Sequence, residues 1–188
     1  MKNNYLTTAW LVLLLALIFG ASLAGVQTAL KPLIDANKLA ETYRQIPELV
    51  PGGSAAGEAQ SLGELSAYSV VDDAGQPLGW VLPTGGQGFA DRIEVLIGFN
   101  RDASVVTGLY VLDQKETPGL GNKIVEESWR KQFTGKQTSP ALNVVKSAPA
   151  QANDIQAVTG ATISSDSIVA IVNQSVAKFR AALKKAGE

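Results

Sequence analysis

Residues 92–114 read "RIEVLIGFNRDASVVTGLYVLDQ". Apolar side chains alternate with polar or small ones on both sides of Asn100-Arg101-Asp102, which is typical of two β-strands joined by a turn. Residues 67–86, "AYSVVDDAGQPLGWVLPTGG", repeat this arrangement around a turn that contains Asp73-Ala74-Gly75. These four strands predict an antiparallel sheet.

Helical patterns lie on both sides of the predicted sheet in the sequence. Residues 165–185 carry apolar side chains at every third or fourth position and predict the clearest helix, and residues 33–50 and 124–133 predict two more. Residues 51–65, "PGGSAAGEAQSLGEL", have the composition of a loop, and residues 142–148 predict a further short strand. The expected fold class is therefore α+β, an antiparallel sheet packed with helices.

The N-terminal stretch has the character of a membrane anchor. No charged side chain occurs between Lys2 and Lys31, and the apolar run from about residue 5 to 26 is long enough to cross a hydrocarbon core of ~30 Å. A cleaved signal peptide is the competing interpretation, with Ser22-Leu23-Ala24 as its cleavage site, but the apolar run is longer than a signal core. The expected organisation is a cytoplasmic head (1–4), a transmembrane helix (5–28), a connecting helix and loop (29–66) and a globular domain (67–188).

Composition limits the chemistry of the chain. The 188 residues include no Cys and no His, and the formal net charge is −1. Cysteine-ligated iron–sulfur clusters, thiolate nucleophiles and imidazole bases are therefore excluded. We expect no metal site and no catalytic side chain, and no nucleic-acid partner because no basic patch is present. Redox chemistry would require an organic cofactor.

A hydroxyl-rich turn precedes the last predicted helix. Residues 154–174 read "DIQAVTGATISSDSIVAIVNQ", and Thr162 stands just before the expected helix start, with Ser164, Ser165 and Asp166 as capping candidates. Backbone N–H groups at a helix N-terminus lack intrahelical partners and favour anions. Local chemistry leaves two interpretations open: ordinary turn and capping hydroxyls, which are the more common case, or a phosphate site.

Two motifs carry a family resemblance. "TGATISS", residues 159–165, resembles the flavinylation motif of the FMN-binding domain family. The resemblance implies an ester between the FMN phosphate and Thr162, with Thr159, Gly160, Ala161 and Ser164 around it. "VLDQKETPGLGNKI", residues 111–124, resembles the segment that lines the flavin ring in the G subunits of Rnf complexes and in the C subunits of the sodium-pumping NADH:quinone reductase.

The second motif supplies candidate ring contacts. Gly119 and Gly121 permit close backbone approach, and Leu120 is expected to pack on the ring face. Glu116, Thr117 and loop N–H groups are expected at the polar edge of the ring. Without the resemblance, this loop is a plain strand-to-helix turn. Further candidates, each with an ordinary surface or core alternative, are Lys146, Lys123, Phe89, Trp80 and Trp129.

The sequence departs from the family pattern at two places. The family often has Asp six residues before the acceptor Thr, where this chain has Gln156, with Asp154 two residues earlier as a substitute. A "GYGG" loop is replaced by residues 85–89, "GGQGF". The first departure bears on recognition by the flavin transferase.

The resemblance implies an electron-transfer subunit without a complete active site of its own. We expect it in an Rnf-type ferredoxin:NAD+ oxidoreductase complex coupled to Na+ or H+ translocation. Its other subunits and a flavin transferase are the expected partners, and the domain is expected on the extracytoplasmic side of the cytoplasmic membrane. Alternatives are the C subunit of a Na+-translocating NADH:quinone reductase, a cofactor-free docking scaffold, and a freestanding flavin reductase.

Overall fold

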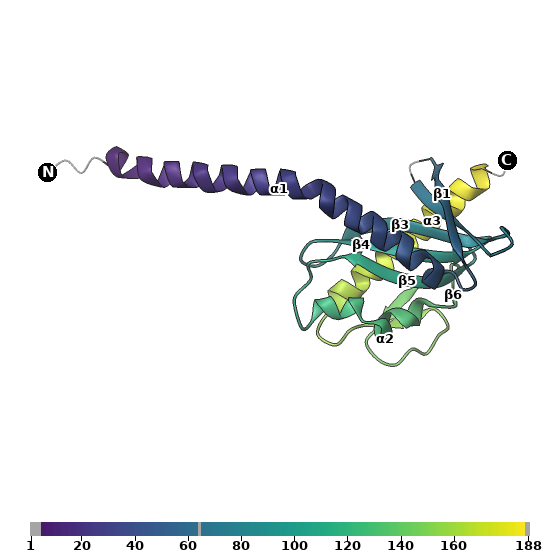
Figure 1. Ribbon diagram of the computed structural model, residues 1–188. Coiled ribbons are helices and arrows are strands. Elements are labelled where there is room, and N and C mark those ends of the chain that lie inside the picture. Colours follow the sequence, from purple (N-terminus) through teal and green to yellow (C-terminus); the bar gives the residue numbers. More distant parts are fainter. Residues whose placement is uncertain (1–4, 64, 187–188) are drawn as a thin grey trace. The chain divides into compact units, whose positions relative to one another are not determined.

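The computed structural model describes residues 5–63 and 65–186 (Figure 1). The chain divides into two units, Met1–Ala40 and Glu41–Glu188. Helix α1 (Tyr5–Leu49) begins in the first unit and ends in the second.

The first unit consists of the long apolar part of α1. By length and composition this helix suffices to cross a membrane, with a mean hydropathy of 2.4 over an 18-residue window. The predicted transmembrane helix (5–28) and the predicted helix over residues 33–50 are parts of one helix, because α1 continues through Pro32. A proline inside a helix removes one backbone hydrogen bond, which a 45-residue helix can tolerate. The predicted head, residues 1–4, lies outside the described residues.

The second unit is built on a six-stranded sheet with the strands in sequence order. All its neighbouring strands are antiparallel. The strands are β1 (Ala55–Leu62), β2 (Leu65–Val71), β3 (Pro77–Gln87), β4 (Arg92–Asn100), β5 (Val105–Asp113) and β6 (Lys136–Gln137). The two predicted hairpins are confirmed as β2–β3 and β4–β5.

Strand β1 corrects the prediction of a loop over residues 51–65. It is an edge strand that pairs with β2, for example Gln60 with Ala67 and Leu62 with Leu65. Its residues are small and polar, so β-propensity gives little signal. The hydrogen-bonding edge of β2, rather than local preference, holds it extended.

The two faces of the sheet are covered by different helices (Figure 1). Helix α3 (Thr162–Ala186) packs Ile168, Val172 and Phe179 into a core with the β4 side chains Val95 and Ile97. The opposite face carries a second core, in which residues 46–50 at the end of α1 pack with Val81 and Leu96. Alternation along the strands explains the division, since neighbouring residues point to opposite faces.

The connection from β5 to β6 is irregular where one helix was predicted. Residues 121–133 form η1 (Gly121–Val125), α2 (Glu127–Arg130) and η2 (Lys131–Phe133). The apolar spacing was nevertheless informative, because Ile124, Trp129 and Phe133 are all buried. The predicted strand in 142–148 is confirmed as β7 (Asn143–Val145), which pairs in parallel with β8 (Asp154–Gln156). Strand β8 leads directly into the turn before α3.

Candidate functional site

A pocket of about 370 Å³ lies at the N-terminal end of α3. Three segments line it: the turn between β3 and β4, the loop after β5, and the first turn of α3. Its residues are Phe89, Thr117, Leu120, Gly121, Gly160, Ala161, Thr162, Ile163 and Ser164. The structure therefore brings together the two motifs that the sequence separates by about 40 residues.

The helix start offers backbone donors to this pocket. Helix α3 begins at Thr162, not at residue 165 as predicted, and Ser165 N–H donates to Ala161 O at 3.1 Å. The amides of residues 162–164 precede that first bond, so they have no intrahelical acceptor. Gly160 has φ +81°, and a Cβ there would lie 3.1 Å from Leu120 Cδ2. Glycine at this position lets the chain turn sharply and keeps the pocket open.

The hydroxyl groups around the turn have different partners. Ser165 Oγ donates to Ala161 O at 3.1 Å and accepts from Val158 N–H at 3.0 Å. Ser164 Oγ donates to Glu116 Oε2 at 2.5 Å. Thr159 is exposed and does not line the pocket. Thr162 is half-buried and lines the pocket, and its hydroxyl has no hydrogen-bond partner within residues 5–63 and 65–186.

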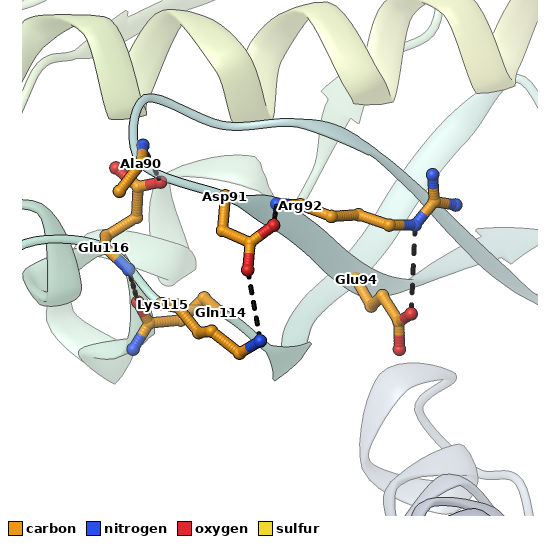
Figure 2. Close-up of polar contacts among 7 residues, drawn as sticks. All are labelled: Ala90, Asp91, Arg92, Glu94, Gln114, Lys115 and Glu116. Carbon is orange, nitrogen blue, oxygen red and sulfur yellow. Dashed lines mark hydrogen bonds and ion pairs between the residues drawn. The ribbon is translucent and has the colours of Figure 1, made fainter. Parts of the chain in front are cut away.

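Glu116 has a different place from the one expected. Its side chain is 3% exposed and is not among the groups that line the pocket. Oε1 accepts from Ala90 N–H at 3.0 Å, as Figure 2 shows, and Oε2 accepts from Ser164. Both carboxylate oxygens are thus used within the protein. The structure corrects the expectation that Glu116 faces the polar edge of a ligand.

The loop after β5 uses its own backbone donors internally. Leu120 N–H and Asn122 N–H both donate to Thr117 O at 3.2 Å. Gly119 N–H donates to Asn122 Oδ1 at 2.8 Å. These amides were expected to bond a flavin ring, and the structure instead uses them to hold the loop. Asn122, which the sequence interpretation did not single out, organises this turn.

The pocket has an apolar rim. Among the described residues after Tyr43, the exposed large apolar side chains are Phe89, Leu120, Val125 and Ile163. Three of these line the pocket, with 60% of Phe89, 45% of Leu120 and 56% of Ile163 exposed. A flat apolar ligand or a partner surface would remove this area from water. Ile163 was missed because the helix was expected to begin after it.

An exposed ion pair connects the turn beside the pocket to the loop after β5. Lys115 Nζ lies 3.1 Å from Asp91 Oδ2, and Arg92 N–H donates to Asp91 Oδ1 at 2.7 Å (Figure 2). The Arg92 amide and then Lys115 hold the pKa of Asp91 below its ordinary value. The turn that carries Phe89 therefore contacts the loop after β5 through this exposed ion pair as well as through the buried Glu116 side chain.

The remaining candidates lie elsewhere. Trp129 is buried and donates its indole N–H to Gln156 O at 2.8 Å, whereas Trp80 is half-buried and packs edge-on against Phe179. Lys123 and Lys146 are exposed and do not line the pocket. Within the part of the chain that the structure describes, no three carboxylates gather into a metal site.

Both carboxylate oxygens of Asp154 already accept hydrogen bonds within the protein. Oδ2 accepts from Gln151 N–H at 2.9 Å and from Ala150 N–H at 3.1 Å, and Oδ1 accepts from Asn143 Nδ2 at 3.2 Å. The Gln151 amide and then Asn143 lower the pKa of this carboxyl. Asp154 is therefore a poor substitute for a motif carboxylate at position 156, where the Gln156 side chain is exposed.

Comparisons with known proteins agree with this geometry. Residues 88–177, which include every residue of the pocket, match the family model of the FMN-binding domain. The G subunit of the Na+-translocating ferredoxin:NAD+ oxidoreductase complex of Acetobacterium woodii is 37% identical over 119 residues, 62% of this chain and 56% of that protein. The C subunit of the Na+-translocating NADH-quinone reductase of Pasteurella multocida is 33% identical over 144 residues, 73% of this chain and 55% of that protein. The chain spans about half the length of the curated relatives it matches.

Solved structures share the fold. Shewanella oneidensis NqrC superposes with a TM-score of 0.54 at 20% identity, covering 70% of this chain and 67% of that one. The C subunit of the Na+-translocating NADH-quinone reductase from Parabacteroides distasonis gives a TM-score of 0.56 at 20% identity, covering 74% and 81%. The sequence match, the shared fold and the pocket formed by both motifs agree. Residues 88–177 therefore belong to the FMN-binding domain family.

Proposed function

We propose that this protein is a membrane-anchored electron-transfer subunit that carries one FMN, joined through its phosphate to Thr162. The observation that carries the proposal is the pocket at the start of α3. There the Thr162 hydroxyl, which has no partner among the described residues, adjoins both the free helix amides and an apolar rim.

The residues present fit both ends of FMN. The amides of residues 162–164 and the absence of a side chain at Gly160 suit the phosphate, because a helix N-terminus stabilises an anion. Ester formation between the Thr162 hydroxyl and the phosphate releases one water and leaves one negative charge for the helix to stabilise. Leu120, Phe89 and Ile163 offer apolar surface to the ring.

Bound FMN supplies the exchange of one or two electrons. The chain contributes a tether at Thr162, an apolar surface and a fixed loop. Ser164 and Ser165 have their hydroxyls occupied, so the structure supports Thr162 as the acceptor over its neighbours.

We place the subunit in an Rnf-type complex that couples ferredoxin:NAD+ oxidoreduction to Na+ or H+ translocation. The relative from Acetobacterium woodii, at 37% identity, supports this assignment, and α1 supports a membrane anchor. The partners would be the other subunits and a flavin transferase, and the domain would face the extracytoplasmic side. The C subunit of a NADH-quinone reductase is the second candidate, because C subunits of Na+-translocating NADH-quinone reductases match this chain at up to 34% identity.

Intact mass tests the ester. The full-length chain is co-expressed with a flavin transferase, and the expected mass gain equals FMN minus water, on the peptide that contains Thr162. Thr162→Ala should abolish both the gain and the yellow fluorescence of the denatured band. Thr134→Ala, the matched control, should retain them, because Thr134 is exposed and lies outside both the motif and the pocket. A chain that stays unmodified in the presence of active transferase rejects the proposal and favours the cofactor-free scaffold.

Co-purification tests the complex. The chain is captured from its native membranes through a C-terminal tag, and the retained subunits are identified by peptide sequencing. Rnf-type subunits support the assignment, whereas NADH-quinone reductase subunits support the second candidate. Flavinylated protein that retains neither set leaves the freestanding flavin reductase as the remaining alternative.

A further inference from the structure

We propose that Glu116 is the positioning residue of the pocket: its buried carboxylate locks the three pocket walls together and places a negative charge directly behind them. The proposal rests on the proposed function, because the pocket is taken to hold FMN. It assigns Glu116 a role in setting the mobility and the midpoint potential of the flavin, without contact with it.

Each wall contributes one link to this side chain. The turn that carries Phe89 donates Ala90 N–H to Oε1 at 3.0 Å. The first turn of α3 donates Ser164 Oγ–H to Oε2 at 2.5 Å. The third wall is the loop of Glu116 itself, which continues into Thr117 and Leu120. One carboxylate therefore connects segments that are 26 and 48 residues distant in the sequence.

The backbone is packed closely around the carboxylate. A Cβ at Gly88 would lie 2.4 Å from Glu116 Oε1, and a Cβ at Gly121 would lie 2.9 Å from both Glu116 Cβ and Ser164 Oγ. Contacts below 3.0 Å require something to shift. The absence of a side chain at Gly88 and Gly121 therefore leaves the space that the Glu116 side chain occupies. Gly121 and Ser164 line the pocket, so the carboxylate lies immediately behind its wall.

Both oxygens of Glu116 lie within hydrogen-bond distance of a donor, Ala90 N–H for Oε1 and Ser164 Oγ–H for Oε2, and this arrangement fits a carboxylate. An O–H···O distance of 2.5 Å is within the range of charge-assisted bonds. The nearby N-terminus of α3 stabilises this buried charge. A fixed negative charge beside the pocket opposes the addition of electrons to a bound flavin and lowers its midpoint potential.

Three variants of the flavinylated full-length protein in detergent distinguish the role of Glu116 in connecting the pocket walls from the effect of its charge. Glu116→Gln keeps the shape and the bond to Ala90 but removes the charge, whereas Glu116→Ala removes both. Glu126→Gln, at an exposed carboxylate ten residues further along, is the control. We expect a higher midpoint potential with unchanged fluorescence anisotropy in Glu116→Gln, and lower flavin anisotropy in Glu116→Ala. The control should change neither quantity.

Hydrogen exchange provides a readout that does not need flavin. In protein made without flavin transferase, the Ala90 amide should exchange about tenfold faster in Glu116→Ala than in the wild type, because it loses a buried acceptor. Unchanged Ala90 exchange, or an unchanged potential in Glu116→Gln, overturns the proposal. Lack of FMN on the wild-type chain would instead reject the proposed function, and the Ala90 measurement would still decide whether Glu116 connects the walls.

Discussion

At the scale of single residues, the proposed acceptor role of Thr162 depends on which neighbouring hydroxyls already have hydrogen-bond partners. The motif could be recognised in the sequence, but it contains several hydroxyls, and local chemistry alone favoured ordinary caps. The partner that occupies Ser164 is Glu116, 48 residues away, and no local pattern reveals such a contact. For the same reason the sequence placed Glu116 at the ligand, whereas the fold places it behind the wall.

Gly160 supports a test at this scale. Gly160→Ala should lower the free energy of unfolding by more than the ~1 kcal/mol typical of a side chain forced to positive φ, because its Cβ also meets Leu120. Gly119→Ala is the matched control, since its φ is +76° and nothing lies within 4 Å of the added Cβ. Urea unfolding of the full chain in detergent measures both. Equal losses would show that the Leu120 contact carries no cost.

At the scale of elements, strong periodicity was reliable and weak propensity was not. The alternation in 92–114 predicted β4 and β5, and the apolar spacing after residue 165 predicted α3. Strand β1 and the three short segments of residues 121–133 were missed because tertiary pairing and packing, not local preference, define them. The start of α3 was placed three residues late, and this hid Ile163 from the candidate site.

The β7–β8 sheet supports a prediction on pH. The pKa of Asp154 is lowered in the folded chain, so its stabilising effect is complete above its ordinary pKa of 3.8 and is lost as pH falls through the folded value. Asp154→Asn should therefore be less stable than the wild type near neutral pH, and the difference should shrink below about pH 4. Urea unfolding between pH 7 and pH 3 measures this, with the exposed Asp73→Asn as the control. A difference that stays constant with pH would contradict the assigned role.

At the scale of the whole molecule, the apolar N-terminal stretch and the domain share one helix, α1. Residues 46–50 at the end of α1 complete the core on one face of the sheet, so the domain needs the chain from Glu41 onward. Composition alone predicted the span, because no charge interrupts it between Lys2 and Lys31. It did not predict that the same helix continues into the domain, because the apolar stretch and the pattern over residues 33–50 predicted two separate elements.

The side of the membrane on which the domain lies can be measured directly. Lys2 and the amino terminus favour an N-inside orientation, which places residues 41–188 outside the cytoplasm. Alkaline phosphatase, which is active only outside the cytoplasm, should be active when it is fused after Glu188. A green fluorescent protein fused at the same position should be dark, because it does not fold after export by the general route. Each reporter is a control for the other, because an orientation that activates one of them silences the other. Because Lys31 also flanks the span, Lys2→Glu should weaken the bias and raise the fluorescent fraction. Bright fluorescence with inactive phosphatase on the unaltered chain would put the flavin pocket on the cytoplasmic side, and the proposed extracytoplasmic electron transfer would have to be abandoned.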